Sequence, residues 1–590
     1  MCSKENYLGI NIETERNSLL SEQANILLRE YYCRKCETSP QQAFARAAVA
    51  YCEGDFEFAQ RIYDYASTKK FMFASPVLSN APFPGETPKA MPVSCFLTYV
   101  PDTLEGLINH TTELRWLSVK GGGVGGHWSD IRSVSDKTPG PIPFLHTVDA
   151  DMTAYRQGKT RKGSYAAYMD ISHPDIVEFI NMRVPTGDTN RKNLNLFNAV
   201  NVSDKFMEAV AADGNFDLLD PNDKSVRQTI KARKLWEQIL TTRSRTGIPY
   251  INFIDAANRH LPEEMKKAGM KIRGSNLCNE IHLPTGADKT AVCCLSSVNL
   301  EYYREWGDGQ IIRDLIRLLD NVLNFFIKYC PDVLAKAKKG AEDDRPLGLG
   351  AMGEHSLYQK EGISFESDKA HFLDAEIFAR MKAEALKETL QLGKERGECP
   401  SMKGTGKRNS HLLAVAPNAN SAIIIGCSPS IEPIKANAFT HRTRIGSHLI
   451  KNKYLEQELE LLGKNTQDIW SSIIVNGGSI QHLDLPVKLK EVYKTAVEID
   501  QHKVVKNAAS RQKYICQGQS VNLFFPAGAN TKYIQTTHFE MWRLGGKGLY
   551  YYRTEASQRA ETVAKRVINR KKRFGKKSSE EENECLACQG

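Results

Sequence analysis

The residues with the clearest chemical capacity lie in one short stretch, residues 274–285, which reads GSNLCNEIHLPT. Cys278 stands between Asn276 and Glu280, two positions from each. In an extended strand, side chains two residues apart point the same way, and in a tight loop they can crowd around one point. Either arrangement brings a thiol, an amide and a carboxylate within reach of one small ligand. Such a set suits chemistry on a sugar, with the carboxylate against a hydroxyl and the sulfur against a C–H bond.

Other cysteines could supply electrons to such a site. Cys95 follows Ser94 at an apolar strand, and Cys293 and Cys294 are adjacent in AVCCLSSVNL. Two thiols that meet near Cys278 can deliver two electrons by closing a disulfide. Either Cys293 or Cys294 could be the partner of Cys95, and buried cysteines are commonly inert apolar residues.

Two patterns near the C-terminus also carry redox capacity. Tyr550, Tyr551 and Tyr552 are consecutive, which favours a β-strand by propensity and also suits a relay that passes an electron and a proton stepwise. Cys585 and Cys588 form a CxxC motif that can exchange with a buried disulfide; a zinc site in the tail is the alternative. A second CxxC, at Cys33 and Cys36, has no further pair nearby and is interpreted as ordinary thiols.

Composition limits the class of protein. The chain has 590 residues, of which 41% are hydrophobic and 25% charged. No apolar run approaches the roughly 18 residues that a membrane span needs, and the N-terminus lacks the apolar core of a signal peptide. We therefore expect a cytoplasmic protein that contacts neither membrane nor nucleic acid. Much of the formal charge of +10 lies in residues 565–577, KRVINRKKRFGKK, which are typical of a solvated tail.

The remaining pattern predicts a large α/β domain. Residues 13–72 show helical periodicity, and FMFASPVLSNAP and MPVSCFLTYVPDTLEGL then read as short apolar strands ended by turns. Lys120–Arg132 is predicted to be a glycine-rich loop and Arg156–Tyr165 a basic loop. Helices and strands alternate to about residue 550, which favours mainly parallel strands with functional loops at their ends. The predicted regions are residues 1–72 (helical), 73–554 (catalytic) and 555–590 (flexible tail).

Taken together, these residues resemble the catalytic large (alpha) subunit of class I ribonucleotide reductase, from about Phe73 to the C-terminus. The resemblance rests on motifs in order: SC at 94–95, NLCNEI at 276–281, a CLS-type cysteine at 293, IEP at 431–433, the tyrosine pair at 550–551 and the terminal CxxC. It implies a ten-stranded α/β barrel of two five-stranded parallel halves around a central finger loop. It also implies a short helical N-terminal region and a flexible C-terminal tail.

The resemblance further implies a role for each of these residues in reducing ribonucleotides, with diphosphates the favoured substrates. Cys278 forms a transient thiyl radical that removes the ribose 3′ hydrogen, Glu280 takes the 3′-hydroxyl proton, and Asn276 hydrogen-bonds the ribose hydroxyls. Cys95 and Cys293 donate two electrons and become a disulfide; the CLS context favours Cys293 over Cys294. Tyr550 and Tyr551 carry the radical from a separate metal-containing small subunit, and Cys585 and Cys588 re-reduce the disulfide and are recharged by thioredoxin or glutaredoxin.

Binding sites follow from the same resemblance, and no metal is expected on this chain. A deoxynucleotide or ATP effector is held by Asp102 and Arg132 at the interface of a homodimer, and Arg161 relays its identity. Asn418 and Asn420 stand where hydroxyl residues are frequent, so the phosphate contacts of this turn are expected from the backbone. The substrate contacts are expected at Ser75, Ser94, Gly123, Pro417, Asn418, Ala419, Asn420 and Ser421.

One departure and three alternatives accompany this interpretation. Cys95 comes too early to leave room for an N-terminal ATP-sensing domain, so we expect specificity control without an overall dATP switch, as suits a virus or a small genome. If the source is viral, the location is the host cytoplasm. A class II, cobalamin-dependent reductase would need no tyrosine relay, and a glycyl-radical enzyme would need a C-terminal glycine loop. A zinc-dependent nucleic-acid-binding protein would use the two CxxC motifs but would leave residues 73–550 unexplained.

Overall fold

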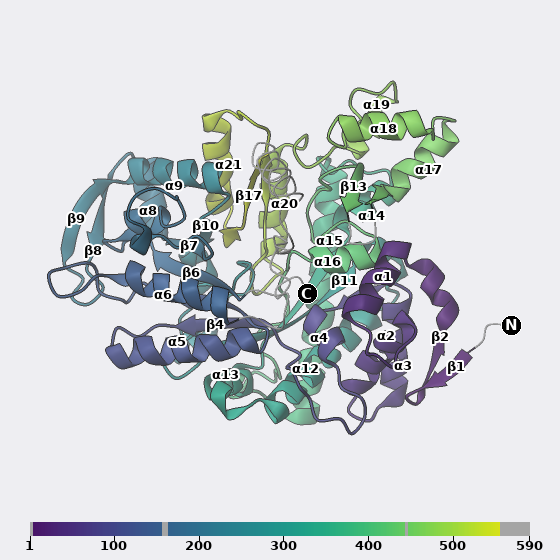
Figure 1. Ribbon diagram of the computed structural model, residues 1–590, viewed down its shortest axis with the longest axis horizontal. Helices are drawn as coiled ribbons and strands as arrows, with labels where there is room; N and C mark the ends of the chain where they lie inside the picture. Colours follow the sequence, from purple (N-terminus) through teal and green to yellow (C-terminus); the bar gives the residue numbers. More distant parts are fainter. Residues whose placement is uncertain (1–3, 156–162, 443–446, 555–590) are drawn as a thin grey trace, which may run out of the picture.

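The N-terminal region is a small hairpin followed by three packed helices. The computed structural model describes residues 4–155, 163–442 and 447–554 (Figure 1). Ser39 and Gln42 form a capping box that begins α2, which typically stabilises a helix by about 1 kcal/mol. The predicted helices of residues 13–72 are present, and the hairpin was not predicted. The elements are β1 (Lys4–Tyr7), β2 (Ile10–Glu13), α1 (Glu22–Tyr31), α2 (Pro40–Ala50) and α3 (Phe56–Ser67).

Five parallel strands form the first half of the barrel, in the spatial order β4, β5, β6, β7 and β10. Cys95 pairs with Gly123, and Gly123 with Ser164, so the strands start in one row. Helices α5, α6, α7 and α10 pack on these strands. The bounds are β4 (Cys95–Tyr99), α5 (Leu104–Val119), β5 (Gly123–His127), α6 (Pro141–Ala154), β6 (Ser164–Asp170), α7 (Ile176–Ile180), β7 (Phe197–Val202), α8 (Asp204–Ala211), β8 (Asn215–Leu219), β9 (Val226–Lys231), α9 (Ala232–Thr246), β10 (Tyr250–Phe253), α10 (Ile254–Arg259) and α11 (Glu263–Lys267).

The second half begins with β11, which runs antiparallel to β4 and parallel to β12. Single parallel bridges then join Leu349 to Leu413 and Val415 to Gln519. The long helices α12 and α15 pack on each other, and α12 also lies on β11 and β12. The bounds are β3 (Phe71–Phe73), α4 (Ser75–Asn80), β11 (Ala291–Asn299), α12 (Gln310–Tyr329), α13 (Ala335–Asp344), β12 (Leu347–Met352), α14 (Glu354–Lys360), α15 (Asp368–Arg396) and α16 (Ala419–Ile425).

The predicted α/β fold with a parallel-rich, curled sheet is confirmed, and the count of ten strands stays a prediction. Within the described residues, the main sheet has nine strands, including the antiparallel β3 and β16. The segments around Leu413 and Gln519 extend it by single bridges only.

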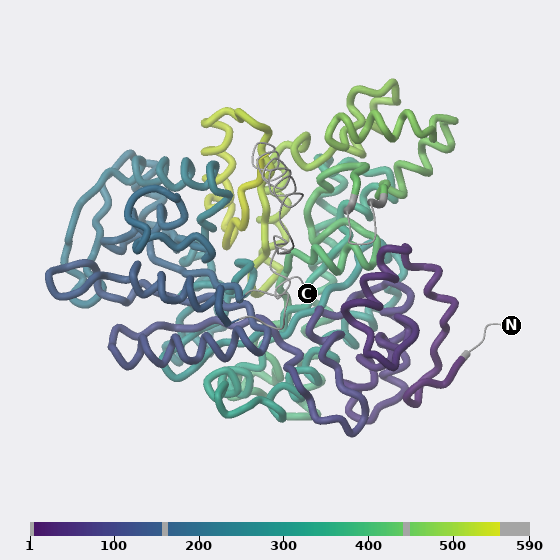
Figure 2. Tube along the Cα trace, viewed as in Figure 1, coloured from purple at the N-terminus to yellow at the C-terminus, as the bar shows by residue number. Residues whose placement is uncertain are grey.

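The C-terminal third of the chain leaves the barrel and returns to it, as Figures 1 and 2 show. Helices α17 to α19 form an outgrowth with its own apolar core around Leu459, Trp470 and Ile473. The chain then packs α20 against α15 and α21. The bounds are β13 (Ala438–Arg442), β14 (Ser447–Lys451), α17 (Lys453–Leu461), α18 (Gln467–Val475), α19 (Val487–Val492), α20 (Gln501–Gln512), β15 (Leu523–Phe525), α21 (Thr531–Arg543), β16 (Gly548–Leu549) and β17 (Tyr552–Thr554).

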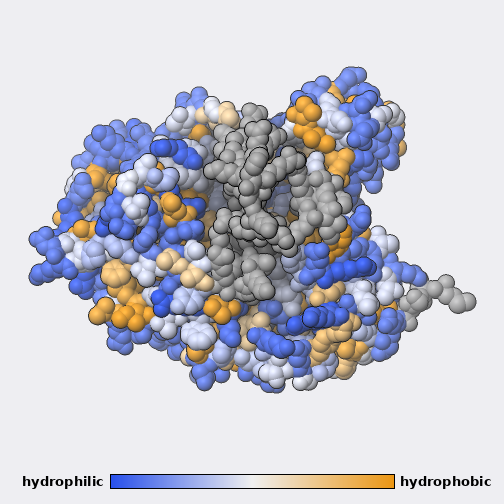
Figure 3. Space-filling view, in the orientation of Figure 1, coloured by the Kyte–Doolittle hydropathy of each residue, from blue (hydrophilic) through white to orange (hydrophobic). Residues whose placement is uncertain are grey.

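Polar residues cover most of the face shown in Figure 3, with apolar side chains gathered in patches, one of them over α5. In the part of the chain that the structure describes, no helix combines the length and apolar character needed to cross a bilayer.

Three local predictions were wrong. The glycine-rich stretch Lys120–Arg132 contains strand β5, because Gly125 lets the backbone approach Ser275; a Cβ there would lie 1.9 Å from the Ser275 carbonyl oxygen. The apolar segment that begins at Phe71 is a strand for three residues only, and Pro76 then lies in the first turn of helix α4. Of the three consecutive tyrosines, only Tyr552 lies in a strand.

Candidate active site

The stretch around Cys278 forms a buried finger loop, residues 274–281, between two parts of the barrel. An antiparallel bridge from Ile272 to Pro284 closes its base. The Asn276 side-chain oxygen accepts hydrogen bonds from the backbone N–H groups of Glu280 and Ile281, at 3.1 and 3.2 Å. Cys278 is 1% exposed and Glu280 is fully buried. The loop therefore holds its thiol and its carboxylate away from bulk water.

Neighbouring elements fix the finger loop from opposite sides. The Tyr168 hydroxyl, on β6, donates to the Asn276 carbonyl oxygen at 2.6 Å. From the other half of the barrel, the Ser520 hydroxyl contacts the Cys278 carbonyl oxygen at 2.7 Å and the Glu280 carboxylate at 3.4 Å. The Gly518 N–H donates to the Glu280 carbonyl oxygen at 2.7 Å. These contacts place the loop inside the barrel.

Cys95 and Cys293 face each other next to this loop. They are directly paired across the antiparallel strands β4 and β11, and no disulfide joins them. The Asn276 amide donates to the Cys95 sulfur at 3.7 Å, and the Gln517 amide donates to the Cys293 sulfur at 3.4 Å. Burial raises the pKa of Cys293 well above its usual value, so this thiol is protonated at neutral pH. Successive side chains alternate along a strand, so Cys294 points to the other face.

A cluster of tyrosine rings leads from the finger loop toward the surface. The ring centres of Tyr550 and Tyr551 are 4.2 Å apart, and Tyr250 on β10 lies 4.7 Å from the first and 5.3 Å from the second. Burial, followed by the nearby Cys278 thiol, raises the pKa of Tyr550 well above its usual value. The phenol is therefore neutral and retains a hydrogen atom to give. Tyr550 is 5% exposed, whereas Tyr551 is half-buried.

The predicted substrate residues lie on segments that contact strand β4 or strand β11. The Gly123 N–H donates to the Ser94 carbonyl oxygen at 2.7 Å, beside Cys95. The Ser75 hydroxyl lies 3.0 Å from that of Tyr32, at the start of α4. Ser297 on β11, four residues after Cys293, donates to the Asn418 side chain at 3.1 Å. Strand β11 therefore carries Cys293 and also supports the turn that precedes α16.

Within that turn, Asn418 has a structural part. It adopts a left-handed conformation with φ of 54° at the N-terminus of α16, and its amide nitrogen donates to the Ala351 carbonyl oxygen at 3.1 Å. Both ends of its side chain thus bind the protein. The other predicted residues of the turn are Pro417, just before it, and Ala419, Asn420 and Ser421 in the first turn of α16.

The predicted effector residues Asp102 and Arg132 form an ion pair at 2.8 Å, after β4 and β5 respectively. Arg161, Cys585 and Cys588 lie outside the described residues. Cys33 and Cys36 are free thiols, and burial raises the pKa of Cys33 to about 11. Among the described residues, no group of three or more His, Cys, Asp or Glu side chains could hold a metal ion.

Several residues that shape the site were not predicted. Gln517 and Ser520 stand in ICQGQSVNLFF, where polar residues interrupt a run that becomes apolar; this pattern could have signalled a buried polar contact. Tyr250 lies in an ordinary strand sequence, YINF. Asn522 donates to the Glu432 carboxylate at 2.9 Å and accepts from the Tyr551 N–H at 3.1 Å. Glu432 of the IEP motif thus helps to position the tyrosine pair.

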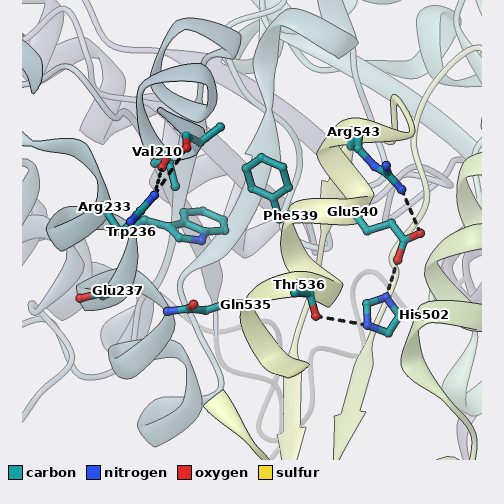
Figure 4. A pocket seen from close by; sticks show the side chains of 11 residues that line it. Val210, Arg233, Trp236, Glu237, His502, Gln535, Thr536, Phe539, Glu540 and Arg543 are labelled. Carbon is teal, nitrogen blue, oxygen red and sulfur yellow. Dashed lines mark hydrogen bonds and ion pairs between the residues drawn. The ribbon is translucent and has the colours of Figure 1, made fainter. Parts of the chain in front are cut away.

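A separate cleft of about 670 Å³ lies between α9 and α21. In Figure 4, Trp236 and Arg233 from α9 face Phe539 and Thr536 from α21, and His502 closes one end. None of the three cysteines lines this cleft. Helix α21 is followed along the chain by β16 and the tyrosine pair, but none of the clustered tyrosines lines the cleft.

Comparisons with known proteins cover nearly the whole described chain. Residues 18–86 match the ribonucleotide reductase all-alpha domain, and residues 93–406 and 401–552 match the ribonucleotide reductase barrel domain. The chain is 51% identical to a Frog virus 3 protein named as a ribonucleoside-diphosphate reductase large subunit, over 97% of this chain and 99% of that one. It is 40% identical to the large subunit of Invertebrate iridescent virus 3, over 98% and 100% of the two chains.

A solved structure agrees with these matches. The Actinobacillus ureae class Id ribonucleotide reductase alpha subunit superposes with a TM-score of 0.80 at 33% identity, over 91% of this chain and 97% of that one. The relatives favour class I over the cobalamin-dependent class II. The family matches also account for the residues that a zinc-dependent nucleic-acid-binding protein would leave unexplained. The chain therefore belongs to the ribonucleotide reductase family and corresponds to its large subunit.

Proposed function

We propose that this chain reduces ribonucleoside diphosphates to 2′-deoxyribonucleotides by a thiyl-radical mechanism and so supplies precursors of DNA. The observation that carries the proposal is the assembly of three thiols around one buried loop. Cys95 and Cys293 pair across β4 and β11, the Asn276 amide reaches the Cys95 sulfur, and Tyr550 lies against Cys278. These groups come from segments far apart in the sequence.

The cysteines and Glu280 divide the chemistry between them. The Cys278 thiyl radical removes the hydrogen atom from the ribose 3′ carbon, and Glu280 takes the proton of the 3′ hydroxyl. The 2′ hydroxyl leaves as water. Cys95 and Cys293 give up two electrons and two protons and become a disulfide, and Cys278 returns the hydrogen atom to the 3′ carbon. Burial serves this reaction because a thiyl radical that met water or stray thiols would be lost.

Radical entry is assigned to Tyr551 and Tyr550. Tyr551 is the more exposed of the two, so it faces the metal-containing small subunit. The Tyr550 radical then takes the hydrogen atom of the Cys278 thiol. Each transfer moves one electron and one proton, so neutral phenols with raised pKa values suit it. After turnover, Cys585 and Cys588 reduce the Cys95–Cys293 disulfide by thiol exchange, and thioredoxin or glutaredoxin recharges them.

Substrate and effector binding complete the proposal. The diphosphate lies at the turn 417–421, with Ser75, Ser94 and Gly123 along the ribose and base, and the effector lies at Asp102, Arg132 and Arg161. Helix α5 supports a homodimer because it exposes Leu104, Ile108 and Trp116, which are 72%, 57% and 42% accessible. An apolar face of this kind is typical of an interface. Action in the cytoplasm of a host cell is part of the same proposal.

Reconstitution with the cognate small subunit tests the proposal. The assay is CDP reduction with dithiothreitol as the reductant, run with and without the small subunit and with Cys278→Ser as the control. We expect deoxycytidine diphosphate only when parent chain and small subunit are both present. Turnover with adenosylcobalamin in place of the small subunit would instead indicate a class II enzyme. Substantial turnover by Cys278→Ser would disprove the radical assignment.

A further inference from the structure

We propose that Arg553 tunes the tyrosine pair: its guanidinium, stacked on Tyr551, disfavours the radical there and drives it inward to Tyr550. The proposal rests on the proposed function and adds a positioning residue to it. Arg553 lies in β17, two residues after Tyr551, and its guanidinium carbon is 4.1 Å from the centre of the Tyr551 ring. It is the closest cation–ring contact in the described part of the chain; the next, Lys451 over Trp470, is 4.9 Å.

The strand pairing of β17 holds Arg553 in this position. Arg553 pairs with Phe524 in the parallel ladder of β15 and β17, and the Tyr552 N–H donates to the Gly247 carbonyl oxygen at 2.9 Å. The Tyr551 backbone is fixed in turn by Asn522 at 3.1 Å. The backbone positions that carry the ring and the guanidinium are thus both fixed by hydrogen bonds to neighbouring segments.

The two inner tyrosines, Tyr250 and Tyr550, have surroundings that differ from those of Tyr551. The rings of Tyr250 and Tyr550 contact each other, and both contact the Tyr551 ring. Tyr550 also lies beside the Cys278 thiol. Among the described cation–ring contacts, none falls on Tyr250 or Tyr550. Arg243 is nearby, but it donates to the carbonyl oxygens of Pro249 and Tyr550, at 2.5 and 2.7 Å, and does not lie over a ring. A cation therefore distinguishes the outer tyrosine from the inner ones.

The physical effect follows from the charge on the ring face. A phenol ring has a negative face that attracts a cation, and the ring of a phenoxyl radical is poorer in electrons. Arg553 therefore stabilises the reduced Tyr551 more than its radical. From the usual strength of such contacts, we expect the equilibrium between the two radicals to shift toward Tyr550 by about tenfold.

Bonds, protons and electrons balance in both hydrogen-atom transfers, from Tyr550 to Tyr551 and from Cys278 to Tyr550. The O–H bond of Tyr550 breaks and that of Tyr551 forms, as one electron and one proton move together from Tyr550 to the Tyr551 radical. The S–H bond of Cys278 then breaks and the O–H bond of Tyr550 re-forms. Arg553 neither gains nor loses a proton or an electron, so its part is to set the direction of transfer.

A spectroscopic probe tests the stack without turnover. Replacing Tyr551 with 3-nitrotyrosine in the full chain makes its ionisation visible by absorption, since the phenolate is coloured. Burial raises the pKa of the Tyr551 phenol and the charge of Arg553 partly offsets this rise, so Arg553→Gln should raise the pKa of the probe by about 1 unit. Arg553→Lys keeps the charge and should retain most of the lowering. Arg183→Gln is the matched control, because Arg183 lies over Phe197 at 5.2 Å and does not stack on Tyr551.

The functional readout uses the intact pair in the complex with the small subunit. With substrate and effector present, Arg553→Gln should lower CDP reduction about tenfold and should let a tyrosyl radical accumulate on Tyr551, detectable by electron paramagnetic resonance with deuterated tyrosine. Arg183→Gln should match the parent in both measurements. Equal probe pKa values in the parent and Arg553→Gln, or equal turnover of Arg553→Gln and Arg183→Gln, would overturn the inference.

The reductase activity and the tuning role of Arg553 can be contradicted by different results. A parent chain that does not reduce CDP with its small subunit contradicts the proposed function, whatever Arg553 does. A parent chain that turns over, combined with an unchanged probe pKa in Arg553→Gln, contradicts only the tuning role. Thermal melting of each variant identifies any that fails to fold, and Arg553→Lys then keeps the test decisive because it preserves the charge.

Discussion

Cys95 and Cys293 stand directly opposite each other on the antiparallel strands β4 and β11, and no disulfide joins them. The Cβ atoms of such a cross-strand pair are typically about 4.5–5.5 Å apart, slightly more than a disulfide requires. A small movement of the strands is therefore enough to close the bond. Gly348 keeps space for it, because a Cβ at that position would lie 2.9 Å from the Cys293 sulfur.

The first prediction separates Cys293 from its neighbour Cys294. Cys293→Ser should reduce deoxycytidine diphosphate formation to background, because serine cannot form the disulfide. Cys294→Ser should keep most of the activity, since its side chain lies on the other face of β11, and should cost about 1–3 kcal/mol of stability for burying a hydroxyl. CDP reduction and thermal melting check both. The reverse ranking of the two activities would contradict the strand-register argument.

The second prediction concerns the base. Glu280→Gln should lower turnover by about 100- to 10,000-fold, because proton removal by a positioned base typically contributes that much. Substrate binding should persist, since glutamine keeps the size of the side chain and can still accept from the Ser520 hydroxyl. Measuring CDP reduction beside equilibrium CDP binding checks this. Turnover within about tenfold of the parent would show that another group removes the proton.

The third prediction distinguishes two asparagines of the turn 417–421. Asn418→Ala should destabilise the protein by about 2–4 kcal/mol, because it loses two buried hydrogen bonds and places alanine at a positive φ. Asn420→Ala should change stability by less than about 0.5 kcal/mol, since Asn420 is half-buried in the first turn of α16. Denaturant unfolding measures both values. A larger loss for Asn420→Ala would contradict the structural part assigned to Asn418.

The fourth prediction is a loss of stability in acid. Burial lowers the pKa of His110, His411 and His538 to about 3 and that of His355 to about 4. Between these values and the unfolded value near 6.5, the unfolded chain binds protons that the folded chain does not. Stability is therefore fully present above about pH 6.5 and falls as the pH drops toward 3.

One substitution isolates this effect. His110→Gln keeps a partner for Thr98 and Tyr165, which lie 3.2 and 3.3 Å from the His110 ring nitrogen. It removes one titrating group, so the slope of unfolding free energy against pH should decrease by up to about 1.4 kcal/mol per pH unit between pH 6 and 4. Denaturant unfolding at several pH values measures the slope. An unchanged slope would mean that His110 is not buried as the neutral form.

The sequence by itself determined the chemistry of this protein, because its reactive residues are few and stand in recognisable local order. Cys278 with its flanking amide and carboxylate, the tyrosine pair and the alternation of helices and strands can all be read along the chain. Prediction from local pattern failed where a tertiary contact outweighs the propensity of the residues. The glycine-rich stretch that was predicted to be a loop forms β5, because only glycine at position 125 leaves room for the finger loop at Ser275.

Only the tertiary structure decided which residues meet. The register of β4 against β11 sets Cys95 opposite Cys293, and the fold brings Gln517 and Ser520, more than 200 positions away, onto Cys293 and the finger loop. Tyr250, far from Tyr550 in the sequence, joins the tyrosine pair in the same way. The reason is physical: pairing across strands and burial in a barrel depend on distances in space, which spacing along the chain does not encode.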